Sequence, residues 1–371
     1  MSNSSSEYND DINHLLVKSN EINSYNTFYT ASGISNRVII FPPTIDWNWM
    51  KQRPQQLMEQ FSLHGFEVYY CNKTQSESEL YTTINLNLTI IHNNNYLIKI
   101  IVPKLKSQGK KIILWVSWSK LYSSLDEYLP NFIIYDYLDD FSEWKQYLKP
   151  MVDKSNIVIA SSTRLLAQME EEFPHKPSYL VPNGCHLNHF KSCGKIETPY
   201  EFTTHKGPII TYSGAWARWI DHELVNKIAL TFKNALVAII GIEFDSFVDR
   251  NIPNLRYLGY KPYNELPNYL HYSSVCIIPF LLNQITIATN PIKMYEYLAS
   301  GKPVVSTDIP EARYIPSVHI GVDHDSFIEK VKLILDNKIV FCEEEVYNWL
   351  ASHTWGKRFD AILTILNEFA F

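Results

Sequence analysis

The stretch Thr289-Asn-Pro-Ile-Lys-Met-Tyr-Glu-Tyr-Leu-Ala-Ser-Gly-Lys-Pro303 carries the clearest structural signal in the sequence. It predicts a helix that begins at Asn290 and Pro291, because Asn is a favoured N-cap and Pro suits the first helical position. Gly301 is placed to end the helix in a left-handed conformation, and Pro303 prevents its continuation. Apolar runs flank this helix on both sides, which indicates a strand–helix–strand unit.

The same alternation extends over most of the chain. A first set of predicted strands covers 37–41, 67–71, 88–91, 111–116, 132–135, 157–160 and 179–181, with helical patterns at 54–63, 98–106 and 163–172. A second set covers 208–212, 235–240, 255–257, 275–279, 304–306 and 319–322, with helical patterns at 221–232, 263–270, 291–300 and 326–337. Continuous apolar strands alternating with amphipathic helices indicate parallel sheets covered on both faces. The predicted fold is α/β, with two Rossmann-like, doubly wound domains facing a cleft.

Changes in composition along the chain predict its division into domains. We expect residues 1–36, which are rich in Ser and Asn, to form a poorly ordered tail. The first α/β domain is predicted over 37–195 and the second over 196–345, with a polar linker around their boundary. An amphipathic pair of helices closes the chain.

Composition excludes several classes of protein. Of the 371 residues, 46% are hydrophobic and 19% charged, which excludes a wholly disordered chain. The net charge of −6 gives no electrostatic footprint for DNA or RNA, so no nucleic-acid partner is expected. The five cysteines form no C-x-x-C pair, which argues against a disulfide framework and a Cys-rich zinc site. With no secretory signal pattern and no apolar run near the ~20 residues of a spanning helix, a cytoplasmic protein is expected.

The helix after Thr289 has the features of a nucleotide site. It starts at the predicted carboxyl edge of the sheet, where free N–H groups and the helix dipole favour phosphate. Lys293 in its first turn adds a cation, and Glu296 can accept hydrogen bonds from vicinal hydroxyls such as a ribose diol. Together they describe a nucleoside diphosphate site; the alternative is an ordinary, well-capped helix.

Thr211-Tyr-Ser-Gly-Ala-Trp-Ala-Arg-Trp219 is a second candidate segment, between a predicted strand and a predicted helix. Ser213 and Gly214 form a turn where the backbone can approach a diphosphate, and Arg218 is placed to reach its oxygens. Neither G-x-G-x-x-G nor G-x-x-x-x-G-K-[ST] occurs, which argues against dinucleotide dehydrogenases and P-loop NTPases. Tyr260, after the strand at 255–257, is a candidate for stacking on the base.

The loop after the first strand concentrates aromatic and charged residues. Asp46-Trp-Asn-Trp-Met-Lys-Gln-Arg-Pro-Gln-Gln-Leu57 contains Trp47, Trp49 and Arg53 beside Asp46, a combination that suits a sugar ring or a lipid-phosphate carrier. The alternative is that the two tryptophans pack at the domain junction.

An acidic stretch follows another strand of the first domain and should face the same cleft. Tyr135-Asp-Tyr-Leu-Asp-Asp-Phe-Ser-Glu-Trp144 supplies Asp136, Asp139 and Asp140 as candidates for holding an acceptor hydroxyl or acting as base. The alternative for Asp139 and Asp140 is that they cap a helix. No group of His and carboxylate residues has the spacing of a metal site, so no metal is expected.

Taken together, these segments resemble the GT-B glycosyltransferases of group 1 (family 4), and most closely the bacterial cell-surface polysaccharide enzymes like those of teichuronic acid synthesis. The resemblance covers roughly residues 37–315. It rests on six motifs in order: W-x-W-x-x-x-R-P-Q-Q-L at 47–57, Y-D-Y-L-D-D at 135–140, V-P-N-G at 181–184, Y-S-G-A at 212–215, L-G-Y-K-P-Y-x-E-L-P at 258–267 and T-N-P-x-K-x-Y-E-Y-L-A-x-G-K-P-V-V-S-T at 289–307.

The resemblance implies a cofactor-free and metal-independent transfer of a sugar from a nucleoside diphosphate sugar to a glycan or lipid-linked acceptor in surface polysaccharide synthesis, with retention of configuration expected. It implies that the domain over 196–345 binds the donor, that the domain over 37–195 binds the acceptor, and that a final helix over 346–371 returns to the first domain. The alternatives are a catalytically inert GT-B subunit that scaffolds an active partner and a GT-B nucleotide-sugar epimerase.

The predicted site residues combine the motifs with this resemblance. We expect the donor to be bound by Ser213, Gly214, Arg218, Tyr260, Thr289, Asn290, Lys293 and Glu296. We expect the acceptor to be bound by Trp47, Trp49 and Arg53 and the reaction to be served by Asp46, Asp136, Asp139, Arg218 and Lys293.

Two departures from the family pattern bear on these expectations. The family often has two glutamates eight residues apart; Glu296 matches the second, but Ala288 stands at the first. Contacts to the donor sugar are therefore expected from neighbours such as Asn283, Gln284, Thr286 and Thr289. The family's usual histidine after the fourth strand is not found in Trp115-Val-Ser-Trp118.

One basic stretch raises the question of membrane contact. Lys104–Lys111 is a candidate contact with anionic lipid that carries the acceptor, at the inner face of a membrane. The alternative is a solvated helix end.

Overall fold

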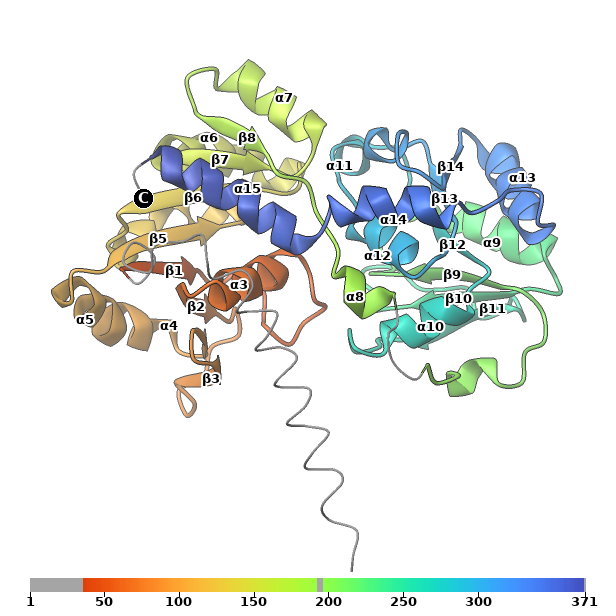
Figure 1. Cartoon of the computed structure of the whole chain (residues 1–371), viewed down its shortest axis with the longest axis horizontal. Helices are drawn as coiled ribbons and strands as arrows, with labels where there is room; N and C mark the ends of the chain where they lie inside the picture. The colour runs from red at the N-terminus through yellow and green to blue at the C-terminus, as the bar shows by residue number, and fades with distance from the viewer. Residues whose placement is uncertain (1–35, 192–195, 370–371) are drawn as a thin grey trace, which may run out of the picture.

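The computed structural model describes residues 36–191 and 196–369, so the predicted tail lies, except for Asn36, outside the described residues. Two α/β domains lie side by side, each built on one sheet with helices on both faces (Figure 1). This confirms the predicted fold class of two Rossmann-like domains.

The first domain contains an eight-stranded sheet in the order β3-β4-β2-β1-β5-β6-β7-β8. All neighbours pair in parallel except β3, which forms an antiparallel hairpin with β4. The sequence pattern missed β3 because all of its residues are exposed, so it carries no apolar run. The strands are β1 (Arg37–Phe41), β2 (Glu67–Cys71), β3 (Tyr81–Asn85), β4 (Leu88–Ile91), β5 (Lys111–Val116), β6 (Phe132–Tyr137), β7 (Ile157–Ala160) and β8 (Ser178–Leu180).

Helices cover both faces of this sheet because its strands are apolar on both sides. In β1, Val38 and Ile40 pack into one buried cluster and Ile39 and Phe41 into another, as expected for a sheet without a solvent-facing side. The helices and helical turns are α3 (Arg53–Leu63), α4 (Asn94–Tyr96), η1 (Leu97–Ile101), α5 (Val102–Ser107), η2 (Ser119–Ser123), η3 (Leu125–Tyr128), η4 (Ser142–Trp144), α6 (Lys145–Lys154) and α7 (Thr163–Glu172).

The second domain contains a six-stranded, all-parallel sheet in the order β11-β10-β9-β12-β13-β14. The carboxyl ends of β9 and β12 lie at the point where the strand order reverses, which is where such sheets bind ligands. The strands are β9 (Ile209–Ser213), β10 (Leu236–Ile240), β11 (Leu255–Gly259), β12 (Val275–Ile278), β13 (Val304–Thr307) and β14 (Val318–Gly321).

The remaining helices surround this second sheet and connect the domains. They are α8 (Leu187–Phe190), η5 (Tyr200–Phe202), α9 (His222–Thr231), α10 (Leu266–Tyr272), α11 (Gln284–Ile287), α12 (Ile292–Ala299), η6 (Pro310–Ala312), α13 (His324–Leu335), α14 (Glu343–Ala351) and α15 (Trp355–Glu368). Helix α10 begins three residues later than the predicted helix at 263–270, because the preceding residues form a loop.

The start of α12 differs from the prediction in one respect. Pro291, not Asn290, occupies the N-cap position, and no side chain caps the helix there. The Asn290 side chain instead accepts hydrogen bonds from the Asn183 backbone N–H and the Tyr295 hydroxyl. At the other end, Gly301 adopts the predicted left-handed conformation, with φ of 71°.

The end of the chain crosses from the second domain to the first. Helix α14 contacts α12, whereas α15 contacts α3 and lies along the first domain (Figure 1). The crossing falls at residues 352–354, later than the boundary predicted at 346. Here it runs beside the first connection between the domains: the Cys185 N–H donates to the His353 carbonyl at 3.0 Å and the Trp355 N–H to the Cys185 carbonyl at 3.2 Å. A Cβ on Gly184 would lie 2.8 Å from the His353 carbonyl oxygen, so the two crossings approach too closely for a larger residue.

Replacing Phe359 tests whether α15 belongs to the core of the first domain. Its ring is fully buried and lies 5.3 Å from the ring of Phe61 and 4.0 Å from that of His64. We expect Phe359→Ala to lower the free energy of unfolding of the first domain by about 3–5 kcal/mol in chemical denaturation. Phe247→Ala, at an 81% exposed position, should leave it nearly unchanged, and equal losses in both variants would contradict this packing.

Candidate functional site

The carboxyl ends of three strands of the second domain enclose a hollow that also touches the first domain. Its walls come from the ends of β9 and β10, the loop after β11, the first turn of α12 and the loop after β1. We call it the glycine hollow; it is lined by Met50, Lys51, Ser213, Gly214, Ile240, Gly241, Tyr260, Lys261, Tyr263, Leu266 and Lys293. Four predicted donor-binding residues, Ser213, Gly214, Tyr260 and Lys293, are therefore brought together here.

Two glycines allow the backbone to close around this hollow. A Cβ on Gly241 would lie 1.9 Å from the Gly214 carbonyl oxygen, and Gly241 has φ of 139°, so a side chain is excluded here. The hydroxyl of Ser213 is buried and has no hydrogen-bond partner among the described residues. The N–H groups of Ser213, Gly214 and Gly241 donate within the protein, so the group that these strand ends leave for a ligand oxygen is the Ser213 hydroxyl.

Three lysines line the glycine hollow, and each forms an ion pair with a glutamate. Lys293 pairs with Glu296 at 3.0 Å within α12, and Lys261 pairs with Glu201 at 2.5 Å. The third is Lys51, which comes from the first domain and pairs with a glutamate of α3 at 2.6 Å. The concentration of ammonium groups favours an anionic ligand.

Glu296 lies directly behind Lys293 and is 1% exposed. One carboxylate oxygen accepts from Lys293, while Oε1 is buried and has no hydrogen-bond partner in the described residues. A buried acceptor left without a partner costs about 1–3 kcal/mol, more when it is charged. A ligand hydroxyl that donates to Oε1 would remove this cost.

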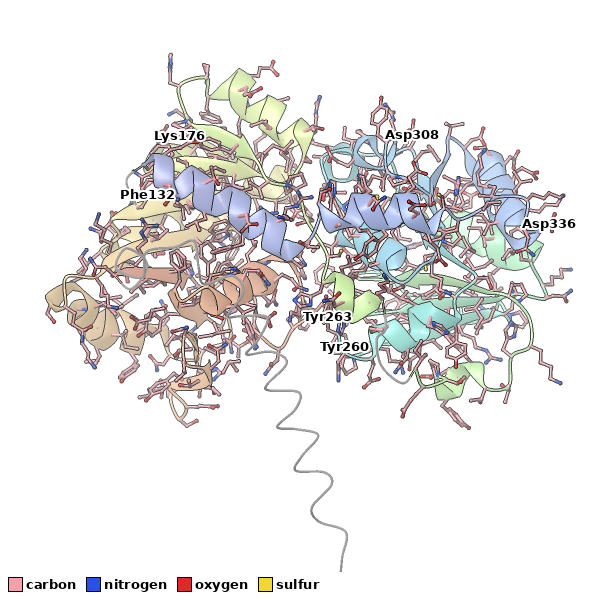
Figure 2. All side chains as sticks on the ribbon, viewed as in Figure 1. Phe132, Lys176, Tyr260, Tyr263, Asp308 and Asp336 are labelled. Carbon is pink, nitrogen blue, oxygen red and sulfur yellow. The ribbon has the colours of Figure 1, made fainter. Side chains whose placement is uncertain are left out.

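A second hollow adjoins the first at the boundary between the domains. We call it the aromatic hollow; it has a volume of about 200 Å³ and is lined by Trp47, Asn48, Trp49, Lys51, Gln55, Glu59, Tyr260 and Tyr263. Figure 2 shows Tyr260 and Tyr263 on the side of the second domain that faces the first. Trp47 and Trp49, predicted to bind the acceptor, thus meet Tyr260, predicted to bind the donor.

Asp46 holds in place the loop after β1 that carries Trp47 and Trp49, which we call the tryptophan loop. Its carboxylate accepts hydrogen bonds from the Thr74 N–H at 2.8 Å and the Thr74 hydroxyl at 2.6 Å. Burial acts to raise the pKa of Asp46, but these hydrogen bonds outweigh it and lower the pKa below its usual value. The ionised carboxylate therefore anchors the loop, and Asp46 is absent from the lining of either hollow.

Arg53 and Asp136 form a buried ion pair and do not reach either hollow. The guanidinium of Arg53 lies 2.9 Å from Asp136, and the two side chains are 2% and 0% exposed. Asp136 also accepts from the indole N–H of Trp115, and Arg53 donates to the Val181 carbonyl at 2.8 Å. Their burial places these two predicted site residues in the framework of the first domain, out of contact with solvent.

Asp139 and Asp140 lie where the first domain meets the second. The amide of Gln284, from α11, donates to Asp140 at 2.6 Å. Burial, and secondly the Asp136 carboxylate, raise the pKa of Asp139 to about 6. A carboxyl with such a pKa can exchange a proton near neutral pH, as a group that orients an acceptor hydroxyl needs to do. Neither residue occupies an N-cap position, the alternative considered from the sequence.

Arg218 and Thr289 are placed outside the two hollows. Arg218 is 55% exposed and forms an ion pair at 2.8 Å with Glu143 of the first domain. Thr289 is partly buried beside the domain interface, where the preceding carbonyl, that of Ala288, accepts from the Ser162 hydroxyl at 2.6 Å. Ala288 itself packs into a buried cluster of the first domain.

The basic stretch at 104–111 contains partnered lysines. Lys106 donates to the Asn131 side chain at 2.8 Å, and Lys110 pairs with Glu67 at 3.2 Å. Within the described ranges, no helix combines the length and apolar character that crossing a membrane requires. In the same part of the chain, no three His, Cys, Asp or Glu side chains are grouped as a metal site would need.

The residues of the hollows that sequence reasoning did not name as site residues include Lys51, Gly241, Lys261 and Tyr263. Gly241 directly follows the apolar run at 235–240, so its position at a strand end was a usable signal. Lys51 lies within the quoted tryptophan motif, but nothing in its local pattern shows that it contacts the other domain. Contacts of that kind depend on the placement of the two domains.

Comparison with known proteins shows what parts of this chain are similar to. Residues 208–337 match the family model Glycosyl transferases group 1. A protein of Bacillus subtilis (strain 168) named as the teichuronic acid biosynthesis glycosyltransferase TuaH is 22% identical over 190 residues. That match covers 48% of this chain and 47% of TuaH, so the chain spans about half the length of the curated relative it matches.

Two solved structures share the fold over most of the chain. Sucrose-phosphate synthase from Thermosynechococcus elongatus has a TM-score of 0.66 at 13% identity, covering 90% of this chain and 99% of that one. An E. coli structure described as trehalose-6-phosphate bound with UDP-2-fluoro glucose has a TM-score of 0.64 at 11% identity, covering 89% and 98%. These two structures show that the chain shares their fold, and its residues 208–337 are similar to the group 1 glycosyltransferases.

Removing Arg53 tests its structural role. We expect Arg53→Ala to lower the free energy of unfolding by about 3–5 kcal/mol, because it leaves Asp136 as an uncompensated buried charge. Lys149→Ala, which breaks an exposed ion pair with Asp153, should cost less than about 1 kcal/mol. Chemical denaturation compares the two; a stability unchanged by Arg53→Ala would contradict this assignment.

The raised pKa of Asp139 predicts a pH-dependent stability. The pKa is about 6 in the folded protein against a usual value of 3.8, so the folded state favours the protonated carboxyl. The stability that Asp139 contributes is present below pH 3.8 and is lost as the pH rises through 6. Asp139→Asn should therefore melt at a higher temperature than wild type at pH 7.5, and the difference should shrink towards pH 4. A difference that does not depend on pH would show that Asp139 has an ordinary pKa.

Proposed function

We propose that this protein transfers a sugar from a nucleoside diphosphate sugar to a glycan or lipid-linked acceptor in surface polysaccharide synthesis. The observation that carries the proposal is the glycine hollow, where Ser213, Gly214 and Gly241 leave room for a ligand beside Lys293 in the first turn of α12. The family model over 208–337 covers the same segment and supports a sugar donor.

The donor diphosphate is assigned to the glycine hollow. Lys293 stands in the first turn of α12, where its ammonium group adds to the positive end of the helix dipole. Lys261 and, from the first domain, Lys51 add further positive charge. These groups would stabilise the negative charge that grows on the departing diphosphate, which is the main electrostatic need of sugar transfer. In this proposal the protein's own cations serve that need, and no metal or other cofactor is required.

The ribose of the donor is assigned to Glu296. Its free Oε1 lies in a buried position and would accept a hydrogen bond from a ribose hydroxyl, while Lys293 keeps the other oxygen partnered. Arg218 is a further donor contact if its ion pair with Glu143 opens. Solvent screens that exposed pair, so opening it costs little.

The acceptor hydroxyl is assigned to the neighbourhood of Asp139, next to Asp140, which contacts Gln284 of the second domain. The pKa of about 6 at Asp139 suits a carboxylate that orients this hydroxyl and receives its proton. We propose that the transfer retains the configuration of the sugar. We also propose that the protein reaches the cytoplasmic face of a membrane through a lipid-linked acceptor, and not through a lipid contact of Lys104–Lys111.

A second candidate function is favoured by one observation, the burial of Ala288 against the first domain. No carboxylate is available at this position for the donor sugar, as would hold for an inert GT-B subunit that scaffolds an active partner. Such a subunit would bind nucleotide without turning over, whereas an epimerase would convert the donor without acceptor. Release of free nucleotide from UDP-, GDP- and dTDP-sugars, dependent on an acceptor extract, separates the three functions.

Variants of α12 test the donor site. We expect Lys293→Ala and Glu296→Gln each to weaken the binding of the preferred nucleoside diphosphate roughly 10- to 100-fold, because each removes a charged hydrogen-bonding group. Isothermal titration calorimetry with UDP, GDP and dTDP measures this. Tyr314→Ala, at a 91% exposed position of the same domain, serves as the control. Unchanged affinity in both α12 variants would overturn the donor site.

A further inference from the structure

The tryptophan loop of the first domain contacts the part of the second domain that we assign to the donor. We infer that residues 47–51 bind the base of the donor nucleotide, with Trp49 and Tyr260 on its two faces, and do not bind the acceptor as the sequence suggested. The inference rests on the proposed function and specifies how the same site recognises its donor.

The two hollows share three lining residues. Lys51, Tyr260 and Tyr263 line both of them, so a ligand whose phosphates occupy the glycine hollow can extend between these three side chains. In a nucleoside diphosphate the base is the group on the other side of the ribose from the phosphates. The aromatic hollow is therefore where the base would be placed if the diphosphate lies beside Gly214 and Lys293.

The aromatic side chains of this hollow are available for stacking. Trp49 and Tyr260 are each 45% exposed, and in the described part of the chain neither ring stacks on another ring. A flat heteroaromatic base can be held by such rings regardless of its identity, because every base has a π-face. Tyr263 is less available, since it already stacks on His189 with centroids 4.4 Å apart.

The loop that presents Trp49 is held in a defined position. The Trp47 N–H donates to the Asn72 side chain at 2.7 Å, and the Trp47 ring packs edge-on against Tyr70 at 5.0 Å. The Trp49 N–H donates to the Asp46 carbonyl at 3.1 Å. A preorganised loop loses little conformational freedom on binding, which favours a specific ligand.

Polar groups around the aromatic rings match the edges of a base better than an apolar lipid chain. Asn48 and Glu59 line the hollow and offer a side-chain amide and a carboxylate, while the amide of Gln55 already bonds to the backbone of the loop. Lys51 lies 5.1 Å from the centroid of the Tyr263 ring, so its charge is held between the two hollows. Arg53, the other cation of the motif, is buried against Asp136 and unavailable to an acceptor.

A base held in the aromatic hollow would link the two domains. The base would be held by residues from both domains, so nucleotide binding itself would draw the domains together. The acceptor, assigned to the Asp139 end, would then meet a closed donor site.

The experiment compares nucleotide binding with pyrophosphate binding by calorimetry. The ligands are inorganic pyrophosphate and whichever of UDP, GDP or dTDP the wild-type protein binds most tightly. The variants are Trp49→Ala, Tyr260→Ala, their combination, the conservative Trp49→Phe, and Tyr314→Ala as an exposed aromatic control. Circular dichroism verifies that each variant is folded.

We expect Trp49→Ala and Tyr260→Ala each to weaken nucleotide binding about tenfold or more, with pyrophosphate binding unchanged and Trp49→Phe close to wild type. The double variant should lose less than the product of the two single losses, because both rings act on one base. If Trp49→Ala keeps wild-type affinity for the nucleotide, or raises only the KM for the acceptor, the inference is overturned while the proposed donor site stands. A wild-type protein that binds none of the nucleotides overturns the proposed function, and this inference with it.

Discussion

The arrangement of the two domains depends on the buried ion pair between Arg53 and Asp136. The Arg53 guanidinium joins the start of α3 to Asp136 near the end of β6 and to the Val181 carbonyl just beyond β8. Next in the chain, Asn183 accepts from Arg358 of α15 through its carbonyl and donates through its side chain to the Asn290 carbonyl. Breaking the contacts of this buried charge would be costly, so the guanidinium stays in place. Through Val181 and Asn183 it positions the segment that connects the two domains, and with it the start of α12.

Three lysine–glutamate pairs, each formed within one domain, surround the site at this junction. Each lysine of the glycine hollow has a glutamate beside it, so these ammonium groups line the hollow without an uncompensated charge in the unliganded protein. Two of these pairs lie in the second domain and one in the first. A ligand anion would therefore interact with cations from both domains, which makes the phosphate group a point of contact between them.

Sequence patterns predicted the elements of the fold and the carboxyl edges of the strands where the hollows lie, since these follow from local periodicity and turn chemistry. Ser213, Gly214 and Lys293 could be named because a strand end or a helix start fixes their position. The predictions failed where a side chain contacts a residue far away in the sequence. Arg53 and Asp136 lie 83 residues apart in the sequence and form a buried ion pair. Asn290 does not cap α12, because its side chain accepts a hydrogen bond from Asn183 in the connection between the domains. Strand β3 was missed because an exposed edge strand needs no apolar face.

The paired crossings at Cys185 and His353 determine how the domains can move. Backbone hydrogen bonds join the two segments, so we expect both crossings to shift together whenever the domains change their relative position. A side chain at position 184 would press on the His353 carbonyl and push the segments apart, so the glycine is what lets the chain cross twice at one place.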